Sequence, residues 1–160
     1  LIVEIYKESI TKSMKNIAIN RSARRDYEIL ETFEAGMELK GFEVKAIKTG
    51  HINLAGSFVV IKKNEAWLLN ANIPPYQPAN TPEDYDPQRT RKLLLSAAEI
   101  KSLMGRTKEK NLTLVPLRVY NKGRLLKMEI GLGRGKKRAD KREDIKKREW
   151  SRLRRKVETR

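Results

Sequence analysis

Cysteine is missing from this sequence of 160 residues, and histidine occurs only once, as His51. Disulfide scaffolds, thiolate zinc sites and cysteine nucleophiles are therefore excluded. A single histidine cannot build a multi-histidine metal site, and its position beside Gly50 favours an exposed loop residue. We expect no resident metal, no cofactor and no catalytic residue in this chain.

Long apolar runs are also absent, because the longest uninterrupted one covers only the four residues 58–61. A membrane-spanning helix needs about 20 predominantly apolar residues, and a secretory signal needs an apolar stretch of about 7–15. We therefore expect a cytoplasmic protein with no membrane partner.

Positive charge, by contrast, is abundant. Lys and Arg total 36 against 20 Asp and Glu, which gives a net charge of +16 and a pI near 10.2. Residues 134–160 carry 14 basic and 5 acidic side chains, so more than half of the excess lies in this short stretch. Such an excess favours a polyanionic partner, nucleic acid first and an acidic membrane surface second.

The chain divides into three parts. Residues 1–16 show no clear period and are expected to form an N-terminal extension. Residues 17–134 have the length and the alternation of one domain with its own core. Residues 135–160 form a basic C-terminal tail.

Alternating apolar residues predict strands in the middle part. Residues 27–39 are typical of a strand that Gly36 interrupts with a bulge or bend. Residues 57–73 predict a hairpin whose turn contains Asn64, a residue type that tolerates positive φ. A second hairpin is predicted over residues 111–133, near the end of this part.

Two short helices and one loop are predicted between these strands. Residues 41–50 have the spacing of a short helix bounded by glycines. Ser96 and Glu99 form a capping box at the start of a second helix. Residues 74–88 hold five of the six prolines and are expected to form a loop.

Pro116, in the first arm of the last hairpin, predicts an edge or bulge position, since proline cannot donate a ladder hydrogen bond. Five or six antiparallel strands with helices at the margins indicate a mainly β fold. We expect an OB-like antiparallel β-barrel with short flanking helices and the basic C-terminal tail outside it.

Catalytic patterns are weak in this chain. Glu31 and Glu34 form a candidate carboxylate pair, and a nuclease that uses them to hold a metal ion is one alternative function. We expect no third ligand to complete such a site. The run GLGRGKK does not match the G-x-x-x-x-G-K-[ST] pattern of a phosphate-binding loop. We therefore predict that the protein is not an enzyme.

Recognition of RNA or DNA is the function that the basic residues favour. They are concentrated in three stretches, residues 20–27, residues 89–95 and the tail. Lys and Arg neutralise phosphates, which gives salt-dependent affinity with little reading of the base sequence. A ribosomal protein that holds ribosomal RNA through an OB-type barrel is the alternative within this class.

The tail has almost nothing to bury. Drawn as a helix, it brings only Ile145, Trp150, Leu153 and Val157 into one broad sector. Since helices gain most of their stability from packing, we expect the tail to be disordered when free. It is expected to become helical where it enters a corridor lined with phosphate, although a nonspecific basic tail is an alternative.

Four ordered blocks of the sequence read NRSARRDYEILETFEAGMELKGFEVKAIKTG, DPQRTRKLLL, LTLVPLRVY and GLGRGKKRADKRE. Together these blocks resemble the bacterial SsrA-binding protein family, also called small protein B. The resemblance implies an OB-type barrel that binds the tRNA-like domain of transfer-messenger RNA. It implies a monomer that acts in trans-translation, the rescue of ribosomes stalled on a message without a stop codon. The family delivers the charged RNA together with elongation factor Tu to the vacant A site of the ribosome.

The resemblance also implies two sets of site residues. The RNA-binding positions of the family match Asn20, Arg21, Arg24, Glu34, Leu94, Lys127 and Arg134. The positions that act on the ribosome, at the decoding site and in the empty mRNA channel, match Lys136, Lys137, Asp140, Lys141, Arg142, Ile145 and Trp150. For Leu94, a core position remains an open alternative.

The tail departs from the family pattern at one position. Ala139 stands where relatives commonly place His or an aromatic residue that stacks on a ribosomal base. Alanine cannot stack, and such stacking contributes roughly 1–3 kcal/mol per base. We hypothesise that Arg138 lies over the base instead.

Overall fold

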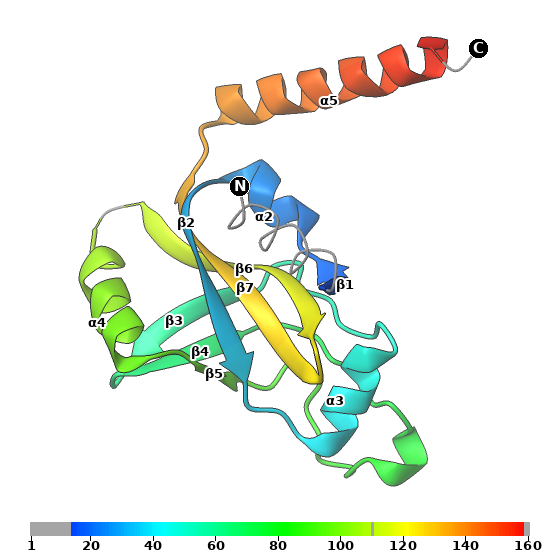
Figure 1. Ribbon diagram of the computed structural model, residues 1–160, viewed down its shortest axis with the longest axis vertical. Helices are drawn as coiled ribbons and strands as arrows, with labels where there is room; N and C mark the ends of the chain where they lie inside the picture. The colour runs from blue at the N-terminus through cyan, green and yellow to red at the C-terminus, as the bar shows by residue number, and fades with distance from the viewer. Residues whose placement is uncertain (1–13, 110, 159–160) are drawn as a thin grey trace, which may run out of the picture.

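The computed structural model describes residues 14–109 and 111–158, apart from the side chains of residues 138–140 and 158 (Figure 1). The predicted extension, residues 1–16, thus falls almost wholly outside the described residues. Seven strands are formed by the part of the chain that is described: β1 (Lys15–Ile19), β2 (Tyr27–Met37), β3 (Phe58–Lys62), β4 (Glu65–Leu69), β5 (Arg91–Leu94), β6 (Leu112–Lys122) and β7 (Leu125–Gly135). The helices are α2 (Arg21–Asp26), α3 (Gly41–Lys48), α4 (Ala97–Arg106), α5 (Arg138–Glu158) and the short 3-10 turn η1 (Pro78–Asn80).

All strand pairs are antiparallel, and their hydrogen bonds run around a ring. The strand order is β1-β6-β3-β4-β5-β2-β7, and β7 pairs again with β6. Strand β6 is long enough to pair with β7 along its whole length, with β3 near its start and with β1 near its end. The prediction of a mainly antiparallel β fold with short flanking helices is confirmed, with seven strands in the described residues rather than five or six. The basic tail, expected to be disordered when free, is a C-terminal helix in this structure.

The two predicted hairpins are confirmed, with their turns where the residues require them. Lys63 and Asn64 join β3 to β4 with φ values of 52° and 60°. Two consecutive positive φ angles are characteristic of the tight turn that matches the twist of the strands. The pairing of β6 with β7 slips between Pro116 and Arg118, which confirms the predicted bulge at this proline.

The prediction for Gly36 is wrong. This residue lies in regular register, opposite Leu94 of β5 on one side and Lys127 of β7 on the other. The slip in β2 occurs earlier, between Ile29 and Glu31. A Cβ at Gly36 would approach the Cβ of Leu94 to 3.2 Å, so glycine is needed here for close approach rather than for a bend.

Alternating side chains from the strands build one central core, closed by α3 and α4. Leu114, Val119, Met128 and Ile130 of the last hairpin are each at most 1% exposed, as their alternation predicts. Leu103 of α4 is fully buried, and Ser96 and Glu99 form the predicted capping box at the start of that helix. The core therefore holds the sheet in a ring whose outer face carries the polar residues.

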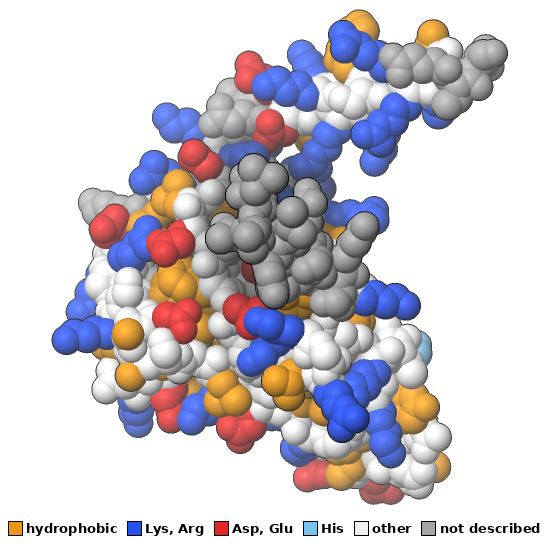
Figure 2. Space-filling view, viewed as in Figure 1, with side chains coloured by type: hydrophobic (Ala, Val, Ile, Leu, Met, Phe, Trp, Pro, Cys, Tyr) orange, Lys and Arg blue, Asp and Glu red, His pale blue; other side chains and the backbone are white. Residues whose placement is uncertain are grey.

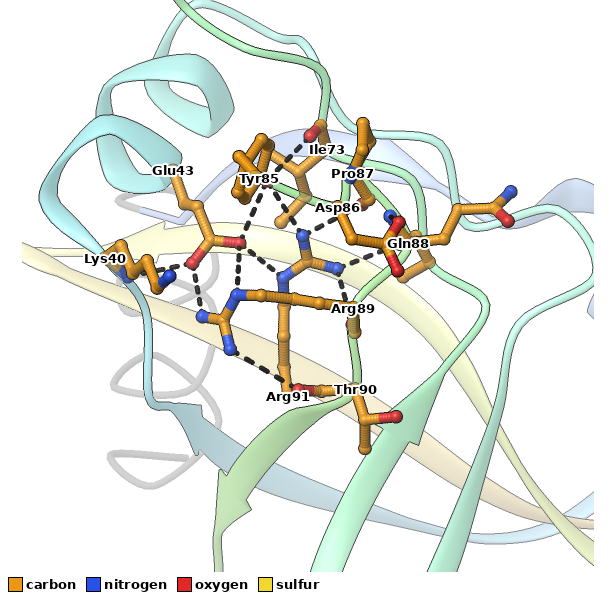
Figure 3. A network of polar contacts seen from close by, with 11 residues as sticks. Lys40, Glu43, Ile73, Tyr85, Asp86, Pro87, Gln88, Arg89, Thr90 and Arg91 are labelled. Carbon is orange, nitrogen blue, oxygen red and sulfur yellow. Dashed lines mark hydrogen bonds and ion pairs between the residues drawn. The ribbon is translucent and has the colours of Figure 1, made fainter. Parts of the chain in front are cut away.

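A buried ionic network ties the proline-rich loop, residues 74–88, to α3 (Figure 3). The carboxylate of Glu43 accepts hydrogen bonds from the guanidinium groups of Arg89 and Arg91, the latter at 2.6 Å from Nε to Oε2. It also accepts the Tyr85 hydroxyl at 3.1 Å and the backbone N–H of Lys40 at 2.9 Å.

The other side of this network anchors the loop backbone. Arg91 donates to the carbonyl oxygens of Ala71, Pro87 and Arg89 at 2.9–3.1 Å, and it is only 1% exposed. Strand β5 was not predicted as a strand because its first residues are basic. The pairing with Glu43 and the bonds to backbone carbonyls together satisfy the Arg91 guanidinium inside the fold.

Candidate nucleic-acid interface

Four strands bring three of the expected RNA-binding residues onto one patch of the outer face. Leu94 of β5 lies opposite Gly36, Gly36 lies opposite Lys127, and Lys127 lies opposite Tyr120 of β6. Glu34 is two residues before Gly36 in β2, so its side chain points to the same face. We call Glu34, Leu94, Lys122 and Lys127 the Glu34 patch; Tyr120, only 2% exposed, supports it from within the fold.

Glu34 is held as a carboxylate in this patch. The Tyr120 hydroxyl donates to its Oε2, and the Lys122 ammonium lies 3.0 Å from its Oε1. The hydrogen bond from Tyr120, followed by the charge of Lys122 and Lys127, holds the pKa of Glu34 below its usual value of 4.5. An ionised carboxylate is an acceptor only, so Glu34 can receive further hydrogen bonds from base amino groups or ribose hydroxyls.

Leu94 is 51% exposed, which excludes the core position that the sequence left open. Its buried neighbour Leu93 takes that place instead, since adjacent residues of a strand point to opposite faces. The absence of a side chain at Gly36 leaves Leu94 standing beside the β2 backbone, close to Lys127. The Glu34 patch thus combines an apolar contact with an acceptor and two cations.

Tyr120 and Lys122 were not identified from the sequence. Both lie at alternate positions of the hairpin arm that faces Lys127, and that alternation is the signal that identifies them. The Arg118 guanidinium lies 4.5 Å from the centre of the Tyr120 ring and donates to Glu129 at 2.5 Å. Burial, with the bond to Glu34 adding to it, raises the pKa of Tyr120, so its hydroxyl remains a donor.

The remaining RNA-binding positions lie at the other end of the sheet. Arg21 and Arg24 are exposed on α2, and Arg134 is exposed near the end of β7. Arg134 is seven residues from Lys127 along one strand, which corresponds to roughly 23 Å. The RNA-binding positions implied by the resemblance therefore fall on two separate surfaces.

Asn20 does not fit the direct RNA contact expected of it. It is 5% exposed, its Nδ2 donates to the carbonyl oxygens of Pro116 and Leu54, and its Oδ1 accepts from Ser22 and from the backbone of Ala23. Its side chain caps α2 and is saturated with partners inside the protein. Asn20 therefore positions the helix that carries the two exposed arginines.

The tail is an α-helix, α5, that projects away from the body of the protein (Figure 1). Its start is attached to α2 through polar groups. The backbone N–H of Lys136 donates to the carbonyl of Asp26 at 2.9 Å, and the ammonium of Lys141 lies 3.7 Å from the Asp26 carboxylate. The Lys136 ammonium bonds to Asp144 of α5, and this hydrogen bond lowers the pKa of that carboxyl.

The large apolar side chains of α5 that the structure describes are all exposed. Ile145, Trp150, Leu153 and Val157 are 43%, 67%, 57% and 74% exposed. Lys137 and Arg142 are exposed too, and Figure 2 shows Lys and Arg side chains projecting from this helix on the visible face. The side chain of Asp140 lies outside the described residues. Helix α5 is thus formed although these apolar side chains are exposed. That the tail is disordered in the free protein remains a prediction.

The carboxylate pair proposed for a nuclease is not assembled. Glu31 pairs with Arg106 of α4, whereas Glu34 pairs with Tyr120 and Lys122. Residues three apart in a strand point to opposite faces, so these carboxylates do not converge. Among the described residues there is no group of three or more His, Cys, Asp or Glu placed to hold a metal ion. The single histidine, His51, is exposed and bonds to Thr49 at 2.8 Å.

Within the described part of the chain, no helix is both long enough and apolar enough to cross a membrane.

Comparisons with known proteins agree on one family. The family model described as "SmpB protein" matches residues 17–159. The SsrA-binding protein of Microcystis aeruginosa is 52% identical over 136 residues, which cover 85% of this chain and 88% of that protein. The SsrA-binding protein of Mesoplasma florum is 54% identical over 136 residues, covering 85% and 91% of the two chains.

A solved structure is also similar, from work described as "tmRNA-SmpB: a journey to the center of the bacterial ribosome". It has a TM-score of 0.63 and 45% identity, over 80% of this chain and 93% of that chain. Identity near one half across most of both sequences leaves no doubt about common descent. The chain belongs to the SsrA-binding protein (SmpB) family, whose members bind RNA and are not enzymes.

Proposed function

We propose that this protein grips the tRNA-like domain of transfer-messenger RNA with the Glu34 patch, while α5 reads the state of the ribosome. As a family member, the chain binds transfer-messenger RNA and acts in trans-translation on the ribosome. The observation that carries the assignment of the patch is the row Leu94–Gly36–Lys127–Tyr120, with Glu34 beside it on the same face.

The ring of strands serves in this proposal as a closed barrel of the OB type. Such barrels present one outer face to nucleic acid and keep their side-chain core inside. Residues 17–134 form this unit, and residues 135–160 form a tail that acts separately. The polar attachment at Asp26 and the exposed apolar residues of α5 support that division.

The tail enters the empty mRNA channel next to the decoding site in this proposal. Its Lys and Arg side chains neutralise phosphates on several sides, which a helix packed on a core could not do. Elongation factor Tu joins the complex that delivers the RNA to the vacant A site. This work takes place on the ribosome, and therefore in the bacterial cytoplasm. The protein contributes contacts and no chemical step.

Replacing Lys127 with Ala tests the patch. We expect weaker binding to the tRNA-like domain and a salt dependence reduced by about one unit in the slope of log K against log salt, because one phosphate contact is lost. Filter binding at several salt concentrations measures both quantities. Lys101→Ala, an exposed lysine of α4 outside the patch, is the matched control. Equal slopes for wild type, K127A and K101A would contradict the assignment.

Replacing Tyr120 with Phe tests how Glu34 is positioned. The aromatic ring is kept, but the donor to Glu34 is removed, so the pKa of Glu34 should rise toward its usual value and its carboxylate should become mobile. We expect RNA binding to weaken by about 3- to 10-fold, because a carboxylate that is no longer held in place makes a weaker hydrogen bond to the RNA, and a typical hydrogen bond contributes about 0.5–1.5 kcal/mol. The salt slope should stay unchanged, because no cation is removed. An unchanged affinity would mean that Glu34 needs no positioning by Tyr120.

A further inference from the structure

A groove on the outer face of β3, β4 and β5 is not used by the proposed function. It has a volume of about 440 Å³, and its floor is formed by Val60, Trp67 and Leu69. Cross-strand pairing places these side chains together, since Val60 lies opposite Trp67 and Trp67 lies opposite Lys92. Thr90 completes the wall. We call this surface the Trp67 groove.

Trp67 is half-buried and borders two hollows. A second hollow of about 210 Å³ adjoins the groove, and Trp67 and Thr90 line both. Each hollow therefore meets the aromatic ring of the same residue. A planar apolar surface open to a concave space is the arrangement on which nucleobases stack.

The rim of the two hollows is cationic. Its charged side chains are Lys40, Lys62, Lys63, Arg89 and Lys92 against Glu38 and Glu65. Arg89 is held by the buried Glu43, and Lys92 is paired with Glu65 at 2.9 Å. Neither Lys62 nor Lys63 has an ion-pair partner within residues 14–109 and 111–158. An apolar floor with a positive rim is complementary to a base with its phosphate.

The groove is continuous with the Glu34 patch. Lys92 and Leu94 are alternate residues of β5 and point to the same outer face. Trp67 lies opposite Lys92, so it stands diagonally from Leu94 at about 8 Å between backbones. An RNA lying on Leu94 and Lys127 is within reach of the indole. This continuity favours RNA over an acidic protein as the occupant.

We propose that the Trp67 groove takes an unpaired nucleotide of the tRNA-like domain of transfer-messenger RNA, with its base stacked on Trp67 and its phosphate on Lys62 and Lys63. This inference extends the proposed function and depends on it. Trp67 would then add affinity without selecting a particular base, because every base offers a face for stacking. It widens the RNA contact from β2, β5, β6 and β7 to β3 and β4.

The test compares Trp67→Ala with Trp67→Phe in the full-length protein, with a transcript of the tRNA-like domain as the probe. Loss of stacking on one base corresponds to a 5- to 150-fold weaker Kd for W67A, from roughly 1–3 kcal/mol. W67F keeps a flat ring and should bind within about 3-fold of wild type. The change in tryptophan emission on adding RNA should be present in the wild type and lost in W67F, since Trp150 is common to both.

A second variant protects the test against misfolding of W67A. Thr90 is exposed on the wall shared by both hollows, so Thr90→Glu adds a negative charge there without touching the core, and Thr90→Gln is its matched control. We expect T90E to weaken RNA binding about 10-fold and T90Q to bind as the wild type does. The melting temperature of each variant reports whether its fold is kept.

The outcomes separate this inference from the proposed function. If the wild type does not bind the tRNA-like domain, the proposed function fails. If the wild type binds and both W67A and T90E bind equally well, the Trp67 groove holds no nucleotide and only this inference is overturned. Normal RNA affinity together with impaired rescue in W67A and T90E would assign the groove to a different partner, which also overturns it.

Discussion

Ending the chain after Gly135 is expected to abolish tagging on stalled ribosomes while leaving binding to transfer-messenger RNA nearly unchanged. Helix α5 is attached to the body through polar contacts at Asp26, and its large apolar side chains Ile145, Trp150, Leu153 and Val157 are exposed. Exposed ion pairs of that kind contribute little to stability. The ring of strands should therefore fold and bind without the tail.

The loss of function should be large because the tail concentrates the charge. Residues 136–160 carry a net charge of +8, which is half of the total. Removing a segment this basic removes its contacts with phosphates. Each such contact contributes to the salt-dependent affinity for the ribosome. Binding to the isolated tRNA-like domain uses the Glu34 patch instead, so we expect its Kd to change by less than about 5-fold.

A matched variant distinguishes the charge of the tail from its helix. Ile145→Pro keeps every Lys and Arg but removes a helical hydrogen bond in the interior of α5, at a cost of about 3 kcal/mol or more. If the helix matters, I145P should tag poorly while it still binds transfer-messenger RNA. A reconstituted rescue assay and filter binding measure the two activities. Equal loss of tagging and RNA binding in the truncated protein would contradict the division between body and tail.

Replacing Glu43 with Ala is expected to destabilise the fold by about 3–5 kcal/mol, because the buried guanidinium of Arg91 and the partly exposed one of Arg89 lose their counter-charge. Glu43 is fully buried, and Arg91 is 1% exposed. The same change removes the side chain that accepts the hydrogen bond from the backbone N–H of Lys40. It also removes one of the two acceptors of the Tyr85 hydroxyl. Loop 74–88 and the start of β5 should then become mobile.

Lowering the pH should also destabilise the fold, through protonation of Glu43. Burial by itself raises the pKa of Glu43, but the hydrogen bonds from Arg89, Lys40 and Arg91 outweigh it and bring the pKa to about 2. Because the folded pKa lies below the usual value of 4.5, the stabilisation is complete above about pH 4.5. It is lost as the pH falls from there toward 2. Glu43→Gln should remove this part of the acid dependence.

Urea unfolding at pH 7 and at pH 3 measures both effects. Glu31→Ala is the control, since Glu31 forms an exposed ion pair with Arg106, whose loss should cost no more than about 1 kcal/mol. If E43A and E31A had the same free energy of unfolding, the network of Figure 3 would not stabilise the fold.

Local sequence patterns predicted those elements whose conformation is set by residues close together in the chain. The turn at Lys63–Asn64, the capped helix that begins after Ser96 and the slip at Pro116 each depend on neighbouring residues alone. Strand β5 and helix α2 were not predicted from the sequence. Arg91 looks exposed until Glu43, 48 residues away, is placed beside it, and the six residues of α2 are too few to show a period.

The sequence by itself determined the charge of this protein, its mainly antiparallel strands, its coreless basic tail and its resemblance to a family of RNA-binding proteins. Composition and alternation are local properties, so they can be read along the chain. Only the tertiary structure decided that Leu94 is exposed beside Lys127, that Asn20 is buried as a cap, and that Trp67 lies on the floor of a groove. Those placements depend on which strands pair and in which register, and pairing between distant segments is set by the packing of the whole core.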